Sequence, residues 1–396
     1  MPTLSDRIRE TAGRSSGFDY LRLCLSISVV LLHTVGVSYG GHAEKAYFDD
    51  TVLKPFYRLV LPMFFALSGY LVAGSLVRSK TIGAFLGLRI IRIYPALAVE
   101  VVLSAFILGP LLTTLPLADY FSHVQFRQYL LNVFGDVHFF LPGVFADNPI
   151  PLKVNAQLWT VPYELLCYIG LTCLALTGVV KKRGISVLAV IFMSGVLIAD
   201  RFARYNGHFL ETRGVFIGLL LIVCFLAGVV MFLYRDIIPW SGKLAAASAM
   251  IAMTLVSVIP LGDYAAPVPI AYMTVYLGLT NFRRAGLLRY GDLSYGIFLY
   301  GFVVQQTVAH VLPWSRYWYL NFAISLPLTV LVAAVSWRYV ERPALGLRSQ
   351  LTRIETWYLS SRPSFARGQF EPAAQEASNS ASFAAGSDQS DKRDAA

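Results

Sequence analysis

Long, nearly uninterrupted apolar runs are the feature that most restricts how this chain can fold. Runs of about twenty residues match an α-helix that crosses a bilayer, whereas a membrane barrel would show alternating segments of about ten residues. Only 14% of the 396 residues are charged, compared with about 25% in soluble domains. The sequence therefore predicts an all-α, polytopic membrane bundle whose transmembrane helices lie near residues 18–39, 53–77, 93–115, 158–180, 184–200, 213–233, 243–261, 265–281, 293–313 and 318–341.

The basic residues predict how these ten spans are oriented. If the N-terminus is cytoplasmic, the inner segments hold 23 of the 33 lysines and arginines, the outer segments hold nine, and Arg22 lies within a span. Because basic loops remain on the cytoplasmic side, both termini are expected there. The same bias accounts for the net charge of +10 without a nucleic-acid partner.

Three parts are expected along the chain. A cytoplasmic N-terminal segment, 1–17, precedes a transmembrane domain, 18–346, and a cytoplasmic tail, 347–396. The tail from about residue 363 lacks apolar periodicity, so we expect it to be largely disordered. The long connection 119–157 is expected to hold a short amphipathic helix near 123–134. The four cysteines lie in apolar runs without metal-ligand spacing, so no metal site is predicted.

The first span carries two ionisable residues, Arg22 and His33. Eleven residues turn a helix by about 1100°, only about 20° beyond three full turns, so the two side chains share a face about 16 Å apart along the axis. Arg22 could snorkel toward lipid phosphate, and His33 could make a structural hydrogen bond. Ionisable groups inside spans are rare, however, and usually line a cavity, which favours one tunnel shared by both.

Glu164, in "QLWTVPYELLCY", is a second deep charge. It lies about 9 Å from the predicted outer end of its span, which is close to the depth expected for His33. A carboxylate bonded to an imidazole fixes its tautomer and suits it to act as a general base. We therefore expect Glu164 to orient His33, with a purely structural pair as the alternative.

Other polar residues lie near the predicted cytoplasmic edge. In "LRIIRIYP", Arg89 and Arg92 are neighbours on one helical face, either as a phosphate clamp or as an ordinary basic loop. Ser68 and Gly69 are small residues typical of close helix packing. Asp292 or Ser294, in "GDLSYGIFLY", could cap a helix. Glu341 could pair with a neighbouring arginine, Arg338 or Arg342.

Six stretches in order across residues 18–346 together resemble the type-3 family of membrane-bound acyltransferases. They are the Arg-x10-His pair, "FFALSGYL", "RIIRIYP", "LWTVPYELLCY", "GDLSYGIFLY" and "WRYVERPAL". The resemblance implies an O-acyltransferase, usually an acetyltransferase that draws on cytoplasmic acetyl-CoA and acylates surface glycans. It also implies that the arginine and histidine of the pair, here Arg22 and His33, are essential.

The remaining motif residues are carried over by the same resemblance. We expect His33, Arg22 and Glu164 to be catalytic. The residues expected to bind acetyl-CoA, used as a co-substrate, are Arg22, Arg89, Arg92, Ser68, Ser294 and Tyr295. Trp159 belongs to the same motif as Glu164. Many family members have a histidine where this chain has Gly301, so a catalytic role for that histidine is excluded here.

The predicted function is acyl transfer, most simply of acetyl, to a hydroxyl of a cell-surface or lipid-linked carbohydrate. The predicted location is the bacterial inner membrane, with lipids and a carbohydrate as partners. O-antigen, exopolysaccharide and lipo-oligosaccharide remain open as acceptors, and succinyl remains open as the group transferred. The alternative is a proton-coupled transporter or flippase in which the buried His33 and Glu164 relay protons.

Overall fold

A computed structural model describes the chain except for residues 12, 14, 179–182, 205–217, 284 and 361–396. The described residues form helices and no strand. The helices are α1 (Leu4–Glu10), α2 (Gly17–Tyr39), α3 (Gly41–Asp49), α4 (Lys54–Arg78), α5 (Ile82–Leu103), α6 (Gly109–Leu112), α7 (Leu117–Ser122), α8 (Val124–Leu130), α9 (Val161–Leu176), α10 (Arg183–Arg204), α12 (Gly218–Leu233), α13 (Gly242–Ser257), α14 (Pro267–Gly278), α15 (Ser294–Val311), α16 (Trp318–Ser336), α17 (Arg342–Gly346) and α18 (Arg348–Ser360).

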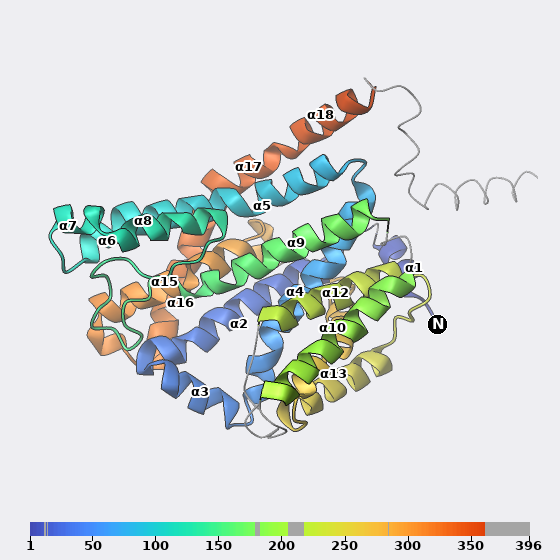
Figure 1. The fold of residues 1–396 in the computed structure, drawn as a ribbon, viewed down its shortest axis with the longest axis horizontal. Helices are drawn as coiled ribbons and strands as arrows, with labels where there is room; N and C mark the ends of the chain where they lie inside the picture. The colour runs from blue at the N-terminus through green and yellow to red at the C-terminus, as the bar shows by residue number, and fades with distance from the viewer. Residues whose placement is uncertain (12, 14, 179–182, 205–217, 284, 361–396) are drawn as a thin grey trace, which may run out of the picture.

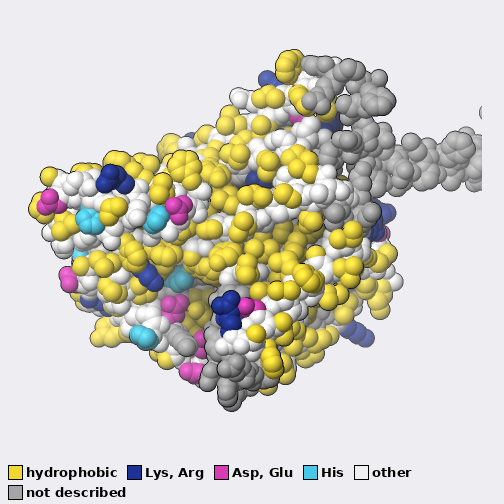
Figure 2. All heavy atoms as spheres, viewed as in Figure 1, with side chains coloured by type: hydrophobic (Ala, Val, Ile, Leu, Met, Phe, Trp, Pro, Cys, Tyr) yellow, Lys and Arg dark blue, Asp and Glu magenta, His cyan; other side chains and the backbone are white. Residues whose placement is uncertain are grey.

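The helices confirm the all-α membrane bundle. Six of those described are long and apolar enough to cross a bilayer, and shorter apolar helices accompany them. Each of the ten predicted ranges contains a helix, and the predicted amphipathic helix corresponds to α8 and the 3-10 turn that follows it. Figure 2 shows apolar side chains over most of the visible face, as expected for a surface in contact with lipid. The chain is a multi-pass membrane protein.

The third predicted span begins too late in the sequence. α5 starts at Ile82 rather than near residue 93, and the helix continues to Leu112 through a π turn. Pro95 lies inside α5, not at its start. The basic residues Arg89 and Arg92 did not end the helix, because their side chains turn into a cavity and not into lipid.

α2 and α4 run through the middle of the bundle, where α12, α14, α15 and α16 pack around them (Figure 1). α5 lies along one side with α17 and α18 against it. Glu355 of α18 accepts hydrogen bonds from the Thr81 backbone N–H at 2.7 Å and from its hydroxyl at 3.1 Å. The helical chain thus extends past the predicted boundary at 346, while residues 361–396 lie outside the described part.

The contact between α4 and α12 depends on two glycines. A Cβ at Gly69 would overlap the backbone carbonyl of Phe225, and a Cβ at Gly228 would overlap the carbonyl of Ala66. The backbones therefore touch at both positions. This confirms the packing expected of Gly69 and places Ser68, its neighbour on α4, at the cavity wall.

Gly69→Ala is expected to destabilise the protein by about 1–3 kcal/mol, the usual cost of overpacking. The reason is that the added methyl group must separate α4 from α12. The measurement is the thermal unfolding midpoint of the purified protein in detergent. Gly170→Ala on α9 is the matched control, because a Cβ there meets nothing within 4 Å. Equal midpoints for the two variants would contradict the packing argument.

α3 folds back from the end of α2 and is anchored by an arginine. Gly40 joins the two helices with φ of +91°, a conformation that favours glycine. Arg58, on α4, is buried and donates to Asp49 Oδ1 at 3.0 and 2.9 Å. It also reaches Asp263 at 3.5 Å. The short helix α3 is thereby held against α2 and α4.

Candidate active site

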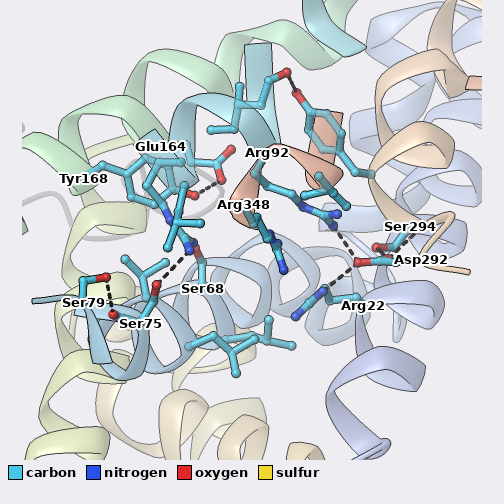
Figure 3. Close-up of a pocket in the computed structure, with 18 of the residues that line it drawn as sticks. Arg22, Ser68, Ser75, Ser79, Arg92, Glu164, Tyr168, Asp292, Ser294 and Arg348 are labelled. Atoms are coloured by element: carbon cyan, nitrogen blue, oxygen red, sulfur yellow. Dashed lines mark hydrogen bonds and ion pairs between the residues drawn. The ribbon is translucent and has the colours of Figure 1, made fainter. Parts of the chain in front are cut away.

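A cavity of about 810 Å³ opens among α2, α4, α5, α9, α15 and α18 (Figure 3). All six residues predicted to bind the cofactor line it, and so does Glu164: Arg22, Ser68, Arg89, Arg92, Glu164, Ser294 and Tyr295. Along α4 its wall runs from Ser79 to Leu61, about 27 Å at the rise of a helix. The structure therefore brings residues from five separate motifs to one deep space.

Asp292 connects three of these motifs. Its Oδ2 accepts from Arg92 at 2.6 Å and from Arg22 at 2.8 Å, while its Oδ1 accepts from the Ser294 hydroxyl at 2.5 Å (Figure 3). Burial opposes ionisation, but the two guanidinium groups outweigh it and hold the pKa of Asp292 well below its usual range. Asp292 thus lies just before α15 and fixes both arginines. The N-cap residue of α15 is Leu293, without a side-chain capping hydrogen bond, so the predicted capping role is not observed.

Other cations in the cavity lack such a partner. Arg89 donates to the Ser75 hydroxyl at 3.0 Å. In the described part of the chain, no ion pair joins Arg78, Arg89 or Arg348 to a carboxylate. Arg348, on α18, points into the cavity in Figure 3 and experiences the charges of Arg22, Arg89 and Arg92. Clustered arginines with few counter-charges are suited to a polyanionic ligand.

Arg348 was missed by the sequence analysis because it lies in the predicted tail. Arg78 was counted only as a loop charge. No periodic pattern in the sequence marks either as a cavity residue. Arg348 reaches the cavity because α17 and α18 return along α5, and Arg78 reaches it from the last turn of α4.

Glu164 does not pair with His33. It accepts a hydrogen bond from the Tyr168 hydroxyl and interacts with Arg89 and Arg92 (Figure 3). Among the described residues no hydrogen bond or ion pair joins Glu164 to His33. The predicted pairing was wrong because helix rise gives a depth but not a direction: α9 packs against α4, α5 and α12, which points Glu164 toward the arginines.

His33 lies beyond the inner end of the cavity. The cavity wall ends at Leu61, Phe64 and Phe298, and the rings of Phe64 and Phe298 are 5.9 Å apart. One turn further along α15, Phe302 meets the His33 ring edge-on at 5.4 Å. Arg22 and His33 share α2, as predicted, but an apolar layer separates the cavity from His33 in this structure.

The carboxylate beside His33 belongs to Glu44. His33 Nδ1 and Glu44 Oε1 are 3.7 Å apart, and their side chains are 23% and 16% exposed. Glu44 lies on α3, in a polar connection outside the predicted spans. A single glutamate in such a connection does not stand out in the sequence as a functional residue. Only the return of α3 onto α2 brings it to His33.

Comparisons with known proteins show which family this chain belongs to. The sequence profile of an acyltransferase domain matches residues 15–339. The chain belongs to the type-3 acyltransferase family. It is 28% identical to an O-acetyl transferase of Shigella phage Sf6, over 83% of this chain and 96% of that protein. It is 29% identical to Nodulation protein 10 of Rhizobium leguminosarum bv. viciae, over 86% and 96% respectively. No solved structure matches the chain significantly.

The acyltransferase packs tightly at Gly301, where many relatives were expected to carry histidine. A Cβ at this position would lie 2.7 Å from Val30 Cγ2 and 3.3 Å from Gln157 Nε2. α15 therefore approaches α2 too closely at Gly301 for an imidazole. The glycine that replaces the histidine of the family motif therefore allows α15 and α2 to lie in close contact.

Glu341 of the acyltransferase makes neither of the expected arginine pairs. It is 3% exposed, accepts from the Ser336 hydroxyl at 3.3 Å and interacts electrostatically with Arg92. It lies in a π turn, Trp337–Glu341, that joins α16 to α17. This turn points Glu341 inward, behind the arginine cluster.

Proposed function

We propose that this acyltransferase takes an acetyl group from acetyl-CoA held in the arginine-lined cavity and transfers it to a carbohydrate hydroxyl at His33. The observation that carries the proposal is the charge of the cavity. Three carboxylates, Asp292, Glu164 and Glu355, face twice as many cations, namely Arg22, Arg78, Lys80, Arg89, Arg92 and Arg348. A donor with several phosphates complements this excess.

The positions of the polar residues support the proposal that the phosphates and the pantetheine arm of acetyl-CoA bind in two different regions of the cavity. Arg78 and Lys80 lie where α4 ends and α5 begins, and Arg89 follows on α5. This end of the cavity is the suggested site for the phosphates. Ser68, on α4, and Tyr295, on α15, also line the cavity, and the proposed path of the pantetheine arm runs past them. Phe64 and Phe298 would have to part for the thioester to reach His33, since their rings close the inner end.

The proposed orientation follows from the positive-inside bias. The cavity mouth then faces the cytoplasm, where acetyl-CoA is available, and His33 faces the opposite side. The partial exposure of His33 and Glu44 leaves room for a hydroxyl to approach from that side. An acceptor such as O-antigen, exopolysaccharide or lipo-oligosaccharide would arrive there.

In the proposed reaction His33 acts as the general base. Its free nitrogen takes the hydroxyl proton as the hydroxyl oxygen attacks the thioester carbonyl. The carbon–sulfur bond then breaks, and the CoA sulfur leaves as a thiolate that takes up a proton. In a second route the imidazole attacks the thioester, the carbon–sulfur bond breaks and CoA leaves as a thiolate. The hydroxyl then attacks the acetyl-imidazole, the carbon–nitrogen bond breaks, and the hydroxyl proton passes to the thiolate. General base assistance contributes about 10²–10⁴-fold, and positioning of the donor supplies more.

The test uses membranes that contain the full-length protein and acetyl-CoA labelled in the acetyl group. We expect release of CoA and label in the glycan fraction. Mass spectrometry of surface glycans from cells with and without the protein then identifies the group added, acetyl or succinyl. The proposal fails if the glycans are identical and the amount of CoA released does not exceed the amount released by control membranes. That result would favour the transporter alternative.

A further inference from the structure

In the described part of the chain the carboxylate that lies 3.7 Å from His33 belongs to Glu44, and no motif assigns it a role. We propose that Glu44 is a positioning residue that orients the His33 imidazole and balances its charge during acyl transfer. The inference rests on the proposed function, in which His33 is the base. It assigns to α3 the part that the sequence had suggested for Glu164.

The backbone of α2 leaves a specific gap for this carboxylate. A Cβ at Gly36, less than one turn after His33, would overlap Glu44 Oε2 and would lie 3.1 Å from Ile150 Cδ1. Only glycine at this position allows the carboxylate to lie against α2. The Glu44 carboxylate, on α3, therefore fits into a space bounded by α2 and by the segment before α9.

α3 is held firmly enough to place a side chain. Its far end is tied to α4 because Arg58, 2% exposed, donates twice to Asp49. Its near end follows directly from α2 through Gly40. Glu44 lies between these two fixed points and points back to α2. Such support is what a positioning group requires.

The charged and titratable groups around Glu44 come from every element that packs against it. They are His33 on α2, Asp49 on α3, Tyr57 on α4 and Lys153 in the segment before α9. Burial raises the pKa of Glu44 to about 7, although Lys153 opposes the shift and Asp49 adds to it. Glu44 is therefore protonated below about pH 7 and ionised above it.

The ionised form is the one that can act on His33. A carboxylate that accepts from Nδ1–H leaves Nε2 free to take the hydroxyl proton, and it stabilises the charged imidazole that results. The separation of 3.7 Å is longer than a hydrogen bond. Catalytic pairs are often long without substrate and shorten when it binds.

The experiment compares Glu44→Gln with wild type in membranes containing the full-length protein, with release of CoA from acetyl-CoA as the readout. Loss of the carboxylate that orients a catalytic histidine costs about 10⁴-fold in serine hydrolases. We expect kcat to fall by about 10- to 10³-fold here because the pair is longer. The KM for acetyl-CoA should stay within about twofold, because Glu44 does not line the cavity. Because only the ionised carboxylate acts on His33, kcat of the wild type should rise with pH near 7. This rise should be absent in Glu44→Gln.

Two further variants keep the test decisive if Glu44→Gln folds poorly. Gly36→Ala retains both side chains but displaces the carboxylate, so it should lower kcat in the same way. Gly41→Ala, whose Cβ meets nothing within 4 Å, is its control and should retain wild-type kcat. Glu44→Asp should recover part of the loss by restoring the charge.

The outcomes separate this inference from the proposed function. If His33→Ala is inactive while Glu44→Gln keeps the wild-type kcat and pH profile, Glu44 has no positioning role and the proposed function stands. If His33→Ala is itself fully active, the role of His33 in the proposed function fails, and the inference fails with it. A Gly36→Ala variant that is folded and unchanged in kcat would also overturn the inference.

Discussion

His33→Ala is expected to lower acetyl transfer by at least about 10²–10⁴-fold, the contribution of a positioned general base. If the imidazole instead carries the acetyl group, the loss should be complete. The reason is that, among the described residues, no hydrogen bond, ion pair or ring contact joins a second imidazole to His33, and Gly301 packs too closely on α2 for one. The measurement is CoA release and glycan labelling at saturating acetyl-CoA.

The control for His33→Ala is His310→Ala, which removes an imidazole elsewhere in the bundle. His310, on α15, contacts the ring of Phe145 at 5.6 Å and does not line the cavity. Both variants should reach the membrane in amounts similar to wild type. A His33→Ala protein that transfers acetyl at the normal rate would show that the base lies elsewhere.

Arg89→Ala is expected to weaken donor binding without an equal loss of turnover. Arg89 lines the cavity, donates to the Ser75 hydroxyl and forms no ion pair within 4 Å of a described carboxylate, so its charge can act on a phosphate. A hydrogen bond to a charged group is worth about 1.5–3 kcal/mol, which corresponds to about a 10- to 150-fold rise in KM for acetyl-CoA. Initial rates over a range of acetyl-CoA concentrations measure it.

Arg353→Ala on α18 is the matched control, because its side chain is exposed and does not line the cavity. Its KM should remain within about twofold of wild type. Arg92→Ala should be harder to interpret, since it also leaves Asp292 with one arginine fewer. A normal KM in a folded Arg89→Ala variant would remove Arg89 from the donor site.

The predictions that the structure confirms concern features that depend on residues close together in the sequence. Gly69 was expected to mark close packing, and it touches the backbone of α12. The start of α15 was expected near residue 293, and Asp292 and Ser294 bond each other there. These predictions succeed because close packing at small residues and the start of a helix depend on residues within one or two turns of each other.

The start of α5 shows where a local rule failed. The end of an apolar run usually marks the membrane edge, but Arg89 and Arg92 lie inside the helix. Their charges are accommodated by a cavity built from other helices. The residues of α5 alone therefore cannot show that these two charges lie in a cavity.

The sequence alone determined the class of the protein: a helical membrane bundle with an arginine group, a buried histidine and the motif order of an acyltransferase. Only the tertiary structure decided which charges meet. Helix rise specifies a depth for Glu164 and His33, but the rotation of each helix about its axis and its neighbours follow from packing. That packing directs Glu164 to the arginines, returns α3 so that Glu44 lies against Gly36, and places Arg348 over the cavity.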